Sequence, residues 1–134
     1  MRHAFLRAAE ESRSVAPETG WTPRHLTFFE KGRLRGALPL YEKSHSWGEF
    51  VFDWAWAQAY ERAGLDYYPK LVSAAPFTPA QSSRLLLDDP DDAEAAQVLL
   101  TAAVQLAEQS DCSSLHIQFP TSNELQYCLS LIHI

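Results

Sequence analysis

The segment HSWGEFVFDWAWAQAYERAG, from His45 to Gly64, contains three of the four tryptophans in this chain of 134 residues. It has no proline, so nothing in it interrupts a continuous helix. Ser46 and Glu49 have the spacing of a capping box, in which the serine oxygen accepts from an early helix N–H and the glutamate reaches back to the cap. Gly64 is placed to end such a helix. The pattern therefore predicts a helix from Trp47 to Ala63.

Two carboxylates and two aromatic rings would share one face of this helix. At about 100° per residue, one narrow sector contains Glu49, Asp53, Trp56 and Tyr60. A carboxylate among rings can have a raised pKa and act as a general base, or it can hold a cationic or hydroxylated ligand. The alternatives are that Glu49 serves only the capping box, and that Asp53 is a surface acid or the partner of Arg62 or Lys70.

Other polar residues near this helix are further candidates. His45, just before the cap, is a candidate proton carrier, or else a hydrogen-bonding surface residue. Tyr67, Tyr68 and Lys70 would line a pocket beside the helix, unless the two tyrosines only pack at the start of a strand. The candidate catalytic residues are Asp53, Glu49 and His45. The candidate substrate-binding residues are Trp56, Tyr60, Tyr67, Tyr68 and Lys70.

The rest of the chain alternates helical and strand patterns. Lys31-Gly32-Arg33 is a turn signal between two apolar runs, which predicts a β-hairpin in which Pro39 marks an edge or strand end. Asp89 and Pro90 suit the start of a long apolar-striped helix that ends near Gln109. The other expected elements are a helix at 3–12, hairpin strands at 24–30 and 34–41, and strands at 68–75, 84–87 and 114–119. This order predicts one mixed α/β domain.

Composition excludes several classes of partner. The 17 acidic and 11 basic residues give a formal charge of −6, which argues against DNA or an anionic membrane as a partner. No apolar run approaches the roughly 18 residues that span a bilayer, and no signal peptide is recognisable, so the expected compartment is the cytoplasm. Cys112 and Cys128 have no metal-binding spacing, so we expect two reduced thiols and no metal site.

Common catalytic signatures are absent from the sequence. It contains no GxSxG, HExxH, Walker or GxGxxG motif. Acidic residues crowd the start of the second long helix, where they would repel a phosphate: Asp88, Asp89, Asp91, Asp92 and Glu94. A donor with a pyrophosphate would have to bind elsewhere.

Three motifs, HSWGEFVFDWAW, YERAGLDYYPKL and PFTPAQSSRLL, resemble those of FemAB-like proteins, which are described as peptidoglycan biosynthesis or recognition proteins. The similarity runs from about Arg2 to Pro120. It implies a GNAT-like mixed sheet flanked by helices and transfer of an acyl or aminoacyl group to an amine. The donor that it implies is acyl-CoA or aminoacyl-tRNA, and the acceptor is a small molecule or a peptidoglycan precursor.

The chain also departs from this family's pattern. Family members are longer and have two GNAT-like halves, and the phosphate-cradling loop of GNAT enzymes is not recognisable here. CLSLIHI, from Cys128 to Ile134, does not continue the pattern. We therefore expect residues 1–126 to be the N-terminal part of a GNAT-like domain, incomplete and inactive alone, and 127–134 to be a non-native tail.

Three hypotheses follow. The first is part of an acyl or aminoacyl transferase in which Glu49 and Asp53 place the substrate or deprotonate the amine. The second is a non-catalytic cell-wall recognition module whose aromatic rings stack on sugar or peptide. In the third, the aromatic helix is only a core element. The sequence leaves the oligomeric state open.

Overall fold

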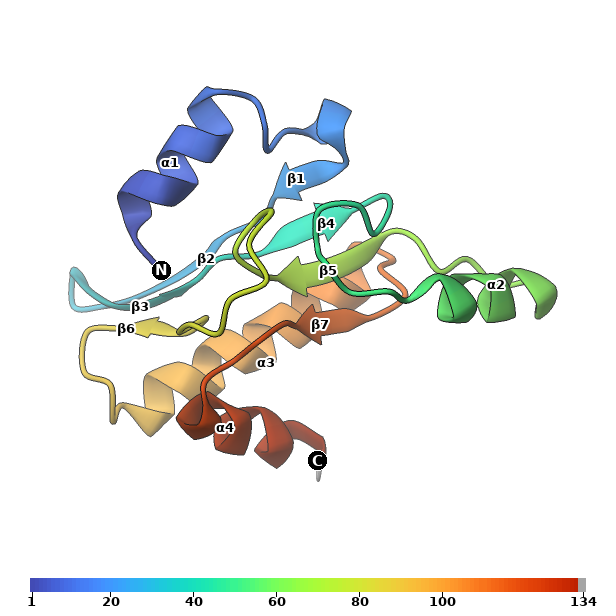
Figure 1. Ribbon diagram of the computed structural model, residues 1–134. Coiled ribbons are helices and arrows are strands. Elements are labelled where there is room, and N and C mark those ends of the chain that lie inside the picture. Colours follow the sequence, from blue (N-terminus) through green and yellow to red (C-terminus); the bar gives the residue numbers. More distant parts are fainter. Residues whose placement is uncertain (133–134) are drawn as a thin grey trace.

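The computed structural model describes residues 1–132, which form two β-sheets and four α-helices (Figure 1). The expected mixed α/β class is confirmed. The elements are α1 His3–Glu11, a short 3₁₀ helix Pro17–Thr19, β1 Trp21–Pro23, β2 Leu26–Glu30, β3 Arg33–Leu38, β4 Tyr41–Lys43, α2 Trp54–Arg62, β5 Lys70–Ser73, β6 Leu86–Leu87, α3 Ala93–Gln109, β7 Leu115–Ile117 and α4 Ser122–Ile132.

The larger sheet has the strand order β1-β4-β5-β7. The first three strands are antiparallel neighbours, and β7 runs parallel to β5 after the chain has passed through α3. In this register Lys43 of β4 lies directly opposite Lys70 of β5, and Val72 lies opposite His116 of β7. The sheet therefore brings residues from four distant segments onto one face.

The smaller sheet, β2-β3-β6, contains the hairpin that the sequence predicted. Lys31 and Gly32 form its two-residue turn with φ of 49° and 79°, as a type I′ turn requires. The expected second hairpin strand, 34–41, divides at Pro39: β3 stays in this sheet and β4 joins the other. The Ser73 hydroxyl donates to the Pro39 carbonyl oxygen at this crossing, at 2.8 Å.

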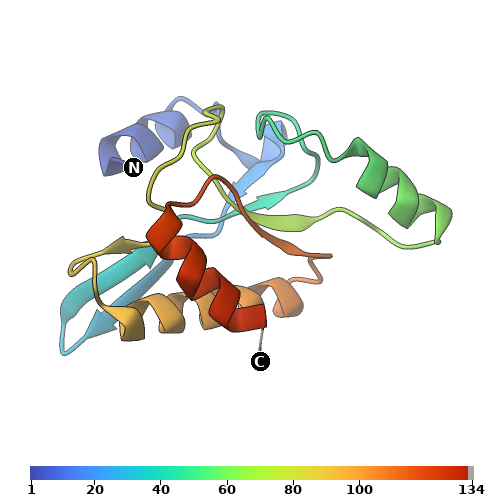
Figure 2. The same cartoon turned by 60° about the horizontal axis from the view of Figure 1, so that its bottom comes forward.

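The main core lies between the sheets and α3 (Figure 2). Residues alternate in direction along a strand, so Leu40 and Leu71 face α3 while Tyr41 and Val72 face the other way. The second face packs with Trp21 and Val15, and Ala9 of α1 lies against this cluster. The helical stripe on the α3 side consists of Ala96, Leu99, Leu100, Ala103 and Ala107.

Several predicted boundaries are wrong. α2 begins at Trp54 rather than Trp47, and α3 is capped by Asp92 rather than Asp89. The Asp92 carboxylate accepts from the Ala95 N–H at 3.0 Å, which satisfies one of the free donors at the start of α3. The short strand β1 and the helix α4 are absent from the expected elements.

The proposed tail, 127–134, overlaps α4, in which Tyr127 and Cys128 pack against the core. Its last two residues, His133 and Ile134, lie outside the described part. Both cysteines are free thiols. Within residues 1–132, no helix is long and apolar enough to cross a bilayer, and no cluster of three or more His, Cys, Asp or Glu side chains could hold a metal ion.

Candidate functional site

The ammonium group of Lys70 is the centre of a buried polar cluster. Lys70 begins β5 and has no solvent exposure. Its Nζ donates three hydrogen bonds, to Ser46 Oγ at 3.0 Å, Glu49 Oε2 at 2.9 Å and Asp53 Oδ2 at 2.6 Å. A buried charge is tolerated only when it is paired and fully hydrogen-bonded, and here all three acceptors come from the one loop before α2. We call these four residues the Lys70 cluster.

This cluster explains why the predicted capping box and helix start are wrong. Ser46 and Glu49 direct their side chains to Lys70, so residues 47–53 form a loop and not the first turns of α2. Gly48 allows the loop to bend, because its φ is 80° and a Cβ there would lie 2.6 Å from the Phe77 ring. Asp53 takes the N-cap position of α2 without a side-chain capping bond.

Three further side chains extend the cluster. The Tyr67 hydroxyl donates to Asp53 Oδ2 at 2.7 Å, and the Tyr68 hydroxyl shares a hydrogen bond with Ser46 Oγ at 2.7 Å. Gln118, which follows β7, donates from Nε2 to Glu49 Oε2 at 2.6 Å. Gln118 was not among the candidates. The alternation of 114–119, which sets it apart from the apolar face of that strand, was the available signal.

Electrostatics make Asp53 a weak base. Burial alone raises the pKa of this carboxyl group, but hydrogen bonds, the largest from Lys70, outweigh it and lower the pKa to about 2. Burial and the bond to Asp53 raise the pKa of Tyr67 above its usual value. At neutral pH the pair is therefore a carboxylate that accepts a hydrogen bond from a phenol.

Lys43 is a second buried lysine on the same sheet face. Its Nζ donates to the Trp47 carbonyl oxygen at 3.0 Å and lies 3.7 Å from the centre of the Trp21 ring. Burial lowers the pKa of Lys43 to about 8; the carboxylate of Glu49 opposes this shift and the charge of Lys70 adds to it. Lys43 therefore loses its proton closer to neutral pH than an exposed lysine does.

A pocket of about 720 Å³ lies between α2 and the two tyrosines. We call it the α2 pocket. Glu61 and Asp66 supply carboxylates to its wall, and neither lysine nor arginine lines it. Tyr67 and Tyr68 reach from this wall into the Lys70 cluster. The lining residues are His45, Trp54, Ala57, Gln58, Glu61, Gly64, Leu65, Asp66, Tyr67 and Tyr68.

The model of the FemAB-like family, described as peptidoglycan biosynthesis/recognition, matches residues 1–131 of the chain. The chain belongs to the FemAB-like family. Searches of curated proteins and of solved structures found no match. The matched range includes residues 127–131, within the stretch that the sequence suggested as a tail.

In this FemAB-like chain, His45 lines the α2 pocket but its ring is engaged elsewhere. Nδ1 accepts from the Trp47 N–H at 3.2 Å, and the ring lies close against Gly20. Burial and, next, the charge of Lys43 lower the pKa of His45. A neutral ring whose Nδ1 accepts a hydrogen bond carries its proton on Nε2, so His45 has no free nitrogen lone pair for a substrate proton.

The remaining candidates do not share one helical face. Glu49 and Asp53 precede α2, so the predicted sector with Trp56 and Tyr60 does not exist. The Trp56 ring is exposed, and the Tyr60 ring packs edge-on against Tyr67 at 5.1 Å. The structure instead confirms the alternative in which Lys70 is the partner of Asp53.

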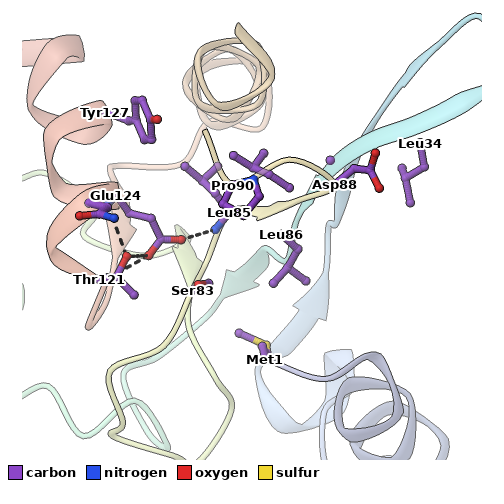
Figure 3. Close-up of a pocket in the computed structure, with 13 residues that line it drawn as sticks. Met1, Leu34, Ser83, Leu85, Leu86, Asp88, Pro90, Thr121, Glu124 and Tyr127 are labelled. Carbon is purple, nitrogen blue, oxygen red and sulfur yellow. Dashed lines mark hydrogen bonds between the residues drawn. The ribbon is translucent and has the colours of Figure 1, made fainter. Parts of the chain in front are cut away.

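The FemAB-like chain has a second cavity, of about 530 Å³, between β6 and the start of α4 (Figure 3). Glu124 lies at its wall, and both carboxylate oxygens are already hydrogen-bonded. They accept from the N–H groups of Arg84, Leu85 and Thr121 and from the Thr121 hydroxyl. This carboxylate fixes the β6 and α4 segments together through backbone N–H groups, which the sequence pattern does not reveal.

Proposed function

We propose that this FemAB-like protein takes part in the transfer of an acyl or aminoacyl group to an amine of a peptidoglycan precursor, and that the α2 pocket receives the amine. The observation that carries this proposal is the lining of the pocket. Its wall combines the carboxylates of Glu61 and Asp66 with aromatic rings, and no lysine or arginine lines it. Carboxylates and ring faces both attract an ammonium group.

In the proposed reaction, Glu61 and Asp66 would hold the substrate as an ammonium group, and one of these carboxylates would take a proton from it to give the free amine. The amine nitrogen then attacks the acyl carbonyl carbon and forms a C–N bond, and the C–S or C–O bond to the donor breaks. The second proton lost by the nitrogen passes to the sulfur or oxygen of the leaving group. The resemblance to the family implies acyl-CoA or aminoacyl-tRNA as the donor, and we keep the cytoplasm as the proposed compartment. A GNAT-like assignment of the fold belongs to this proposal and is supported by the parallel β5–β7 pair joined through α3.

In this proposal the Lys70 cluster positions the pocket wall. Asp53 holds the Tyr67 hydroxyl and Ser46 holds the Tyr68 hydroxyl, so one buried ammonium group fixes both rings through their partners. With a pKa of about 2, Asp53 has little tendency to take a proton from an amine. We therefore assign it positioning of Tyr67 instead of the role of general base.

The test is binding of a peptidoglycan stem peptide with a free side-chain amine, measured by calorimetry on the whole chain. The same peptide with that amine acetylated is the control ligand. We expect Glu61→Gln with Asp66→Asn to weaken binding of the free amine roughly tenfold or more and to leave the acetylated peptide almost unchanged. Equal weakening of both peptides, or of neither, would contradict the proposed amine site.

A second candidate function is recognition without transfer. It is favoured by the Lys70 cluster, in which one oxygen of each carboxylate, Glu49 and Asp53, already accepts from Lys70. Labelled acetyl-CoA and an aminoacyl-tRNA, each incubated with the peptide and the protein, separate the two functions. Label in the peptide supports transfer. Peptide that binds but stays unlabelled with both donors supports recognition.

A further inference from the structure

The cavity of Figure 3 lies at the outer edge of a strand. β6 is the last strand of the smaller sheet, and within residues 1–132 its one strand partner is β3. Leu87 pairs with Gly36, which lies against Leu99 of α3, so Leu87 is on the α3 face of the sheet. Leu86 is on the opposite face, because adjacent residues of a strand alternate. Both leucines line the cavity, which therefore extends around the edge of β6.

The backbone of Leu87 offers one donor and one acceptor at this edge. The Asp88 N–H donates to the Arg35 carbonyl oxygen at 3.0 Å, and Leu86 pairs with Ala37. Backbone groups alternate in direction along an antiparallel strand, so the N–H and C=O of Leu87 point away from β3. Within the described residues, neither group has a hydrogen-bond partner elsewhere in the chain. Unpaired groups at a sheet edge are a template for a further strand.

Helix α4 forms the wall opposite this edge. Figure 3 shows Tyr127 and Glu124 on one side of the cavity and Leu86 on the other. The Glu124 carboxylate accepts from the N–H groups of Arg84 and Leu85, at 2.6 and 2.7 Å, immediately before β6. These bonds hold the start of α4 beside the strand. The cavity is therefore a preformed groove, which lowers the cost of ordering a ligand in it.

The lining of the groove favours an uncharged ligand. Its two carboxylates are already engaged, Asp88 by Arg33 and Glu124 by backbone N–H groups and the Thr121 hydroxyl. Among the lining residues, the one group that can carry a positive charge is the α-amino group of Met1. The volume of about 530 Å³ is within the range of ligand sites. The apolar part of the wall includes Leu34, Leu86, Leu87 and Pro90.

We propose that this cavity, which we call the β6 groove, binds an extended peptide segment with apolar side chains by adding it as a strand to β6. The peptide would accept from the Leu87 N–H and donate to the Leu87 carbonyl oxygen, and its side chains would pack on the apolar wall. Main-chain bonds then supply affinity and the wall supplies selectivity, as in other cases of strand addition. The β6 groove shares no lining residue with the α2 pocket, so the proposal is independent of any transfer activity.

The test uses the whole chain and the blocked peptide acetyl-Ser-Leu-Val-Leu-Ser-amide. Its control is the same peptide with methylated backbone nitrogens on the three apolar residues, which cannot donate to Leu87. Calorimetry should show binding of the first peptide and binding roughly tenfold weaker or less of the control. Amide hydrogen exchange, followed by NMR, locates the site. With the first peptide at about ten times its Kd, the Leu87 N–H should exchange roughly tenfold more slowly.

Two substitutions at one position separate the backbone of Leu87 from its side chain. Leu87→Pro removes the N–H, and proline is tolerated on an edge strand where that N–H faces away from the sheet. We expect this variant to bind the first peptide roughly tenfold more weakly or less. Leu87→Ala is the matched control, since it keeps the N–H, and it should bind more tightly than Leu87→Pro. Circular dichroism checks the fold of both variants.

The outcomes are distinct. No binding of the first peptide, equal binding of the methylated control, or unchanged exchange at Leu87 overturns the proposal. A folded Leu87→Pro variant that binds as wild type does also overturns it. Should Leu87→Pro fail to fold, the two peptides and the exchange of wild type still decide. Decanoate that binds in the groove where the peptide does not would make a lipid chain the occupant and overturn strand addition.

Discussion

The two faces of the larger sheet are built in opposite ways from adjacent residues. On β5, Leu71 enters the apolar core under α3, while its neighbour Lys70 is equally buried but bonded to three acceptors. On the α3 side, many small contacts share the stabilisation, and most substitutions there leave a cavity. On the other side, next to the smaller apolar cluster that contains Trp21 and Val72, one ammonium group organises a loop, two tyrosines and a pocket. Two residues that are equally buried can therefore be stabilised in different ways. Leu71 depends on many small apolar contacts, whereas Lys70 depends on three hydrogen bonds from one charged group.

The largest effect should come from removing the ammonium group. Lys70→Met leaves Glu49 and Asp53 buried without their cation, so we expect a loss of about 3–5 kcal/mol in the free energy of unfolding. Chemical denaturation followed by tryptophan fluorescence and circular dichroism measures this loss. Adding Glu49→Gln and Asp53→Asn to Lys70→Met should restore part of it, because the uncompensated charges are then gone. If Lys70→Met alone is as stable as wild type, the cluster is not critical for the stability of the fold.

Lys43 should make stability depend on alkaline pH. Its pKa is about 8 in the folded chain and ordinarily 10.5, so between these values the unfolded chain binds more protons. The free energy of unfolding should therefore rise from pH 8 to 10.5, by at most about 3 kcal/mol. Denaturation curves across this range, for wild type and Lys43→Met, measure the difference. The same pH slope in both proteins would contradict the assignment.

Asp53 should give a smaller effect at acid pH. Its pKa is about 2 in the folded chain against an ordinary 3.8, so its contribution is present above pH 3.8 and disappears as the pH falls toward 2. After allowance for solvent screening, we expect a loss of about 1–2 kcal/mol. Comparing acid unfolding of wild type with Asp53→Asn measures it. If the variant loses as much stability as wild type over this range, other carboxylates are responsible.

Sequence patterns predicted the apolar core around α3 and the hairpin packed against it well. The α3 stripe, its end at Gln109 and the β2–β3 hairpin all depend on local periodicity and on a two-residue turn. Their burial follows from neighbours three, four or two residues apart, which a sequence displays directly. Even so, the start of α3 was misplaced, because several aspartates could act as its cap.

The Lys70 cluster could be predicted only in part. Ser46 and Glu49 have the local spacing of a capping box, but Lys70, more than twenty residues away in sequence, offers them a buried charge instead. Gln118 comes from still farther along the chain. The pairing of Asp53 with Lys70 was one of the alternatives and is confirmed. Local signals compete with such long-range partners, and the sequence alone does not show which partner is near.

The hydrogen bond from Ser73 to the Pro39 carbonyl has a mechanical consequence. Pro39 lies where the chain leaves the smaller sheet for the larger one, and Ser73 ends β5 in the larger sheet. A proline carbonyl at such a crossing has no ladder partner of its own, and the serine hydroxyl supplies one inside the protein. This hydrogen bond therefore links the crossing point between β3 and β4 to the end of β5. Force or strain applied to the hairpin would pass directly into the strand that carries Lys70.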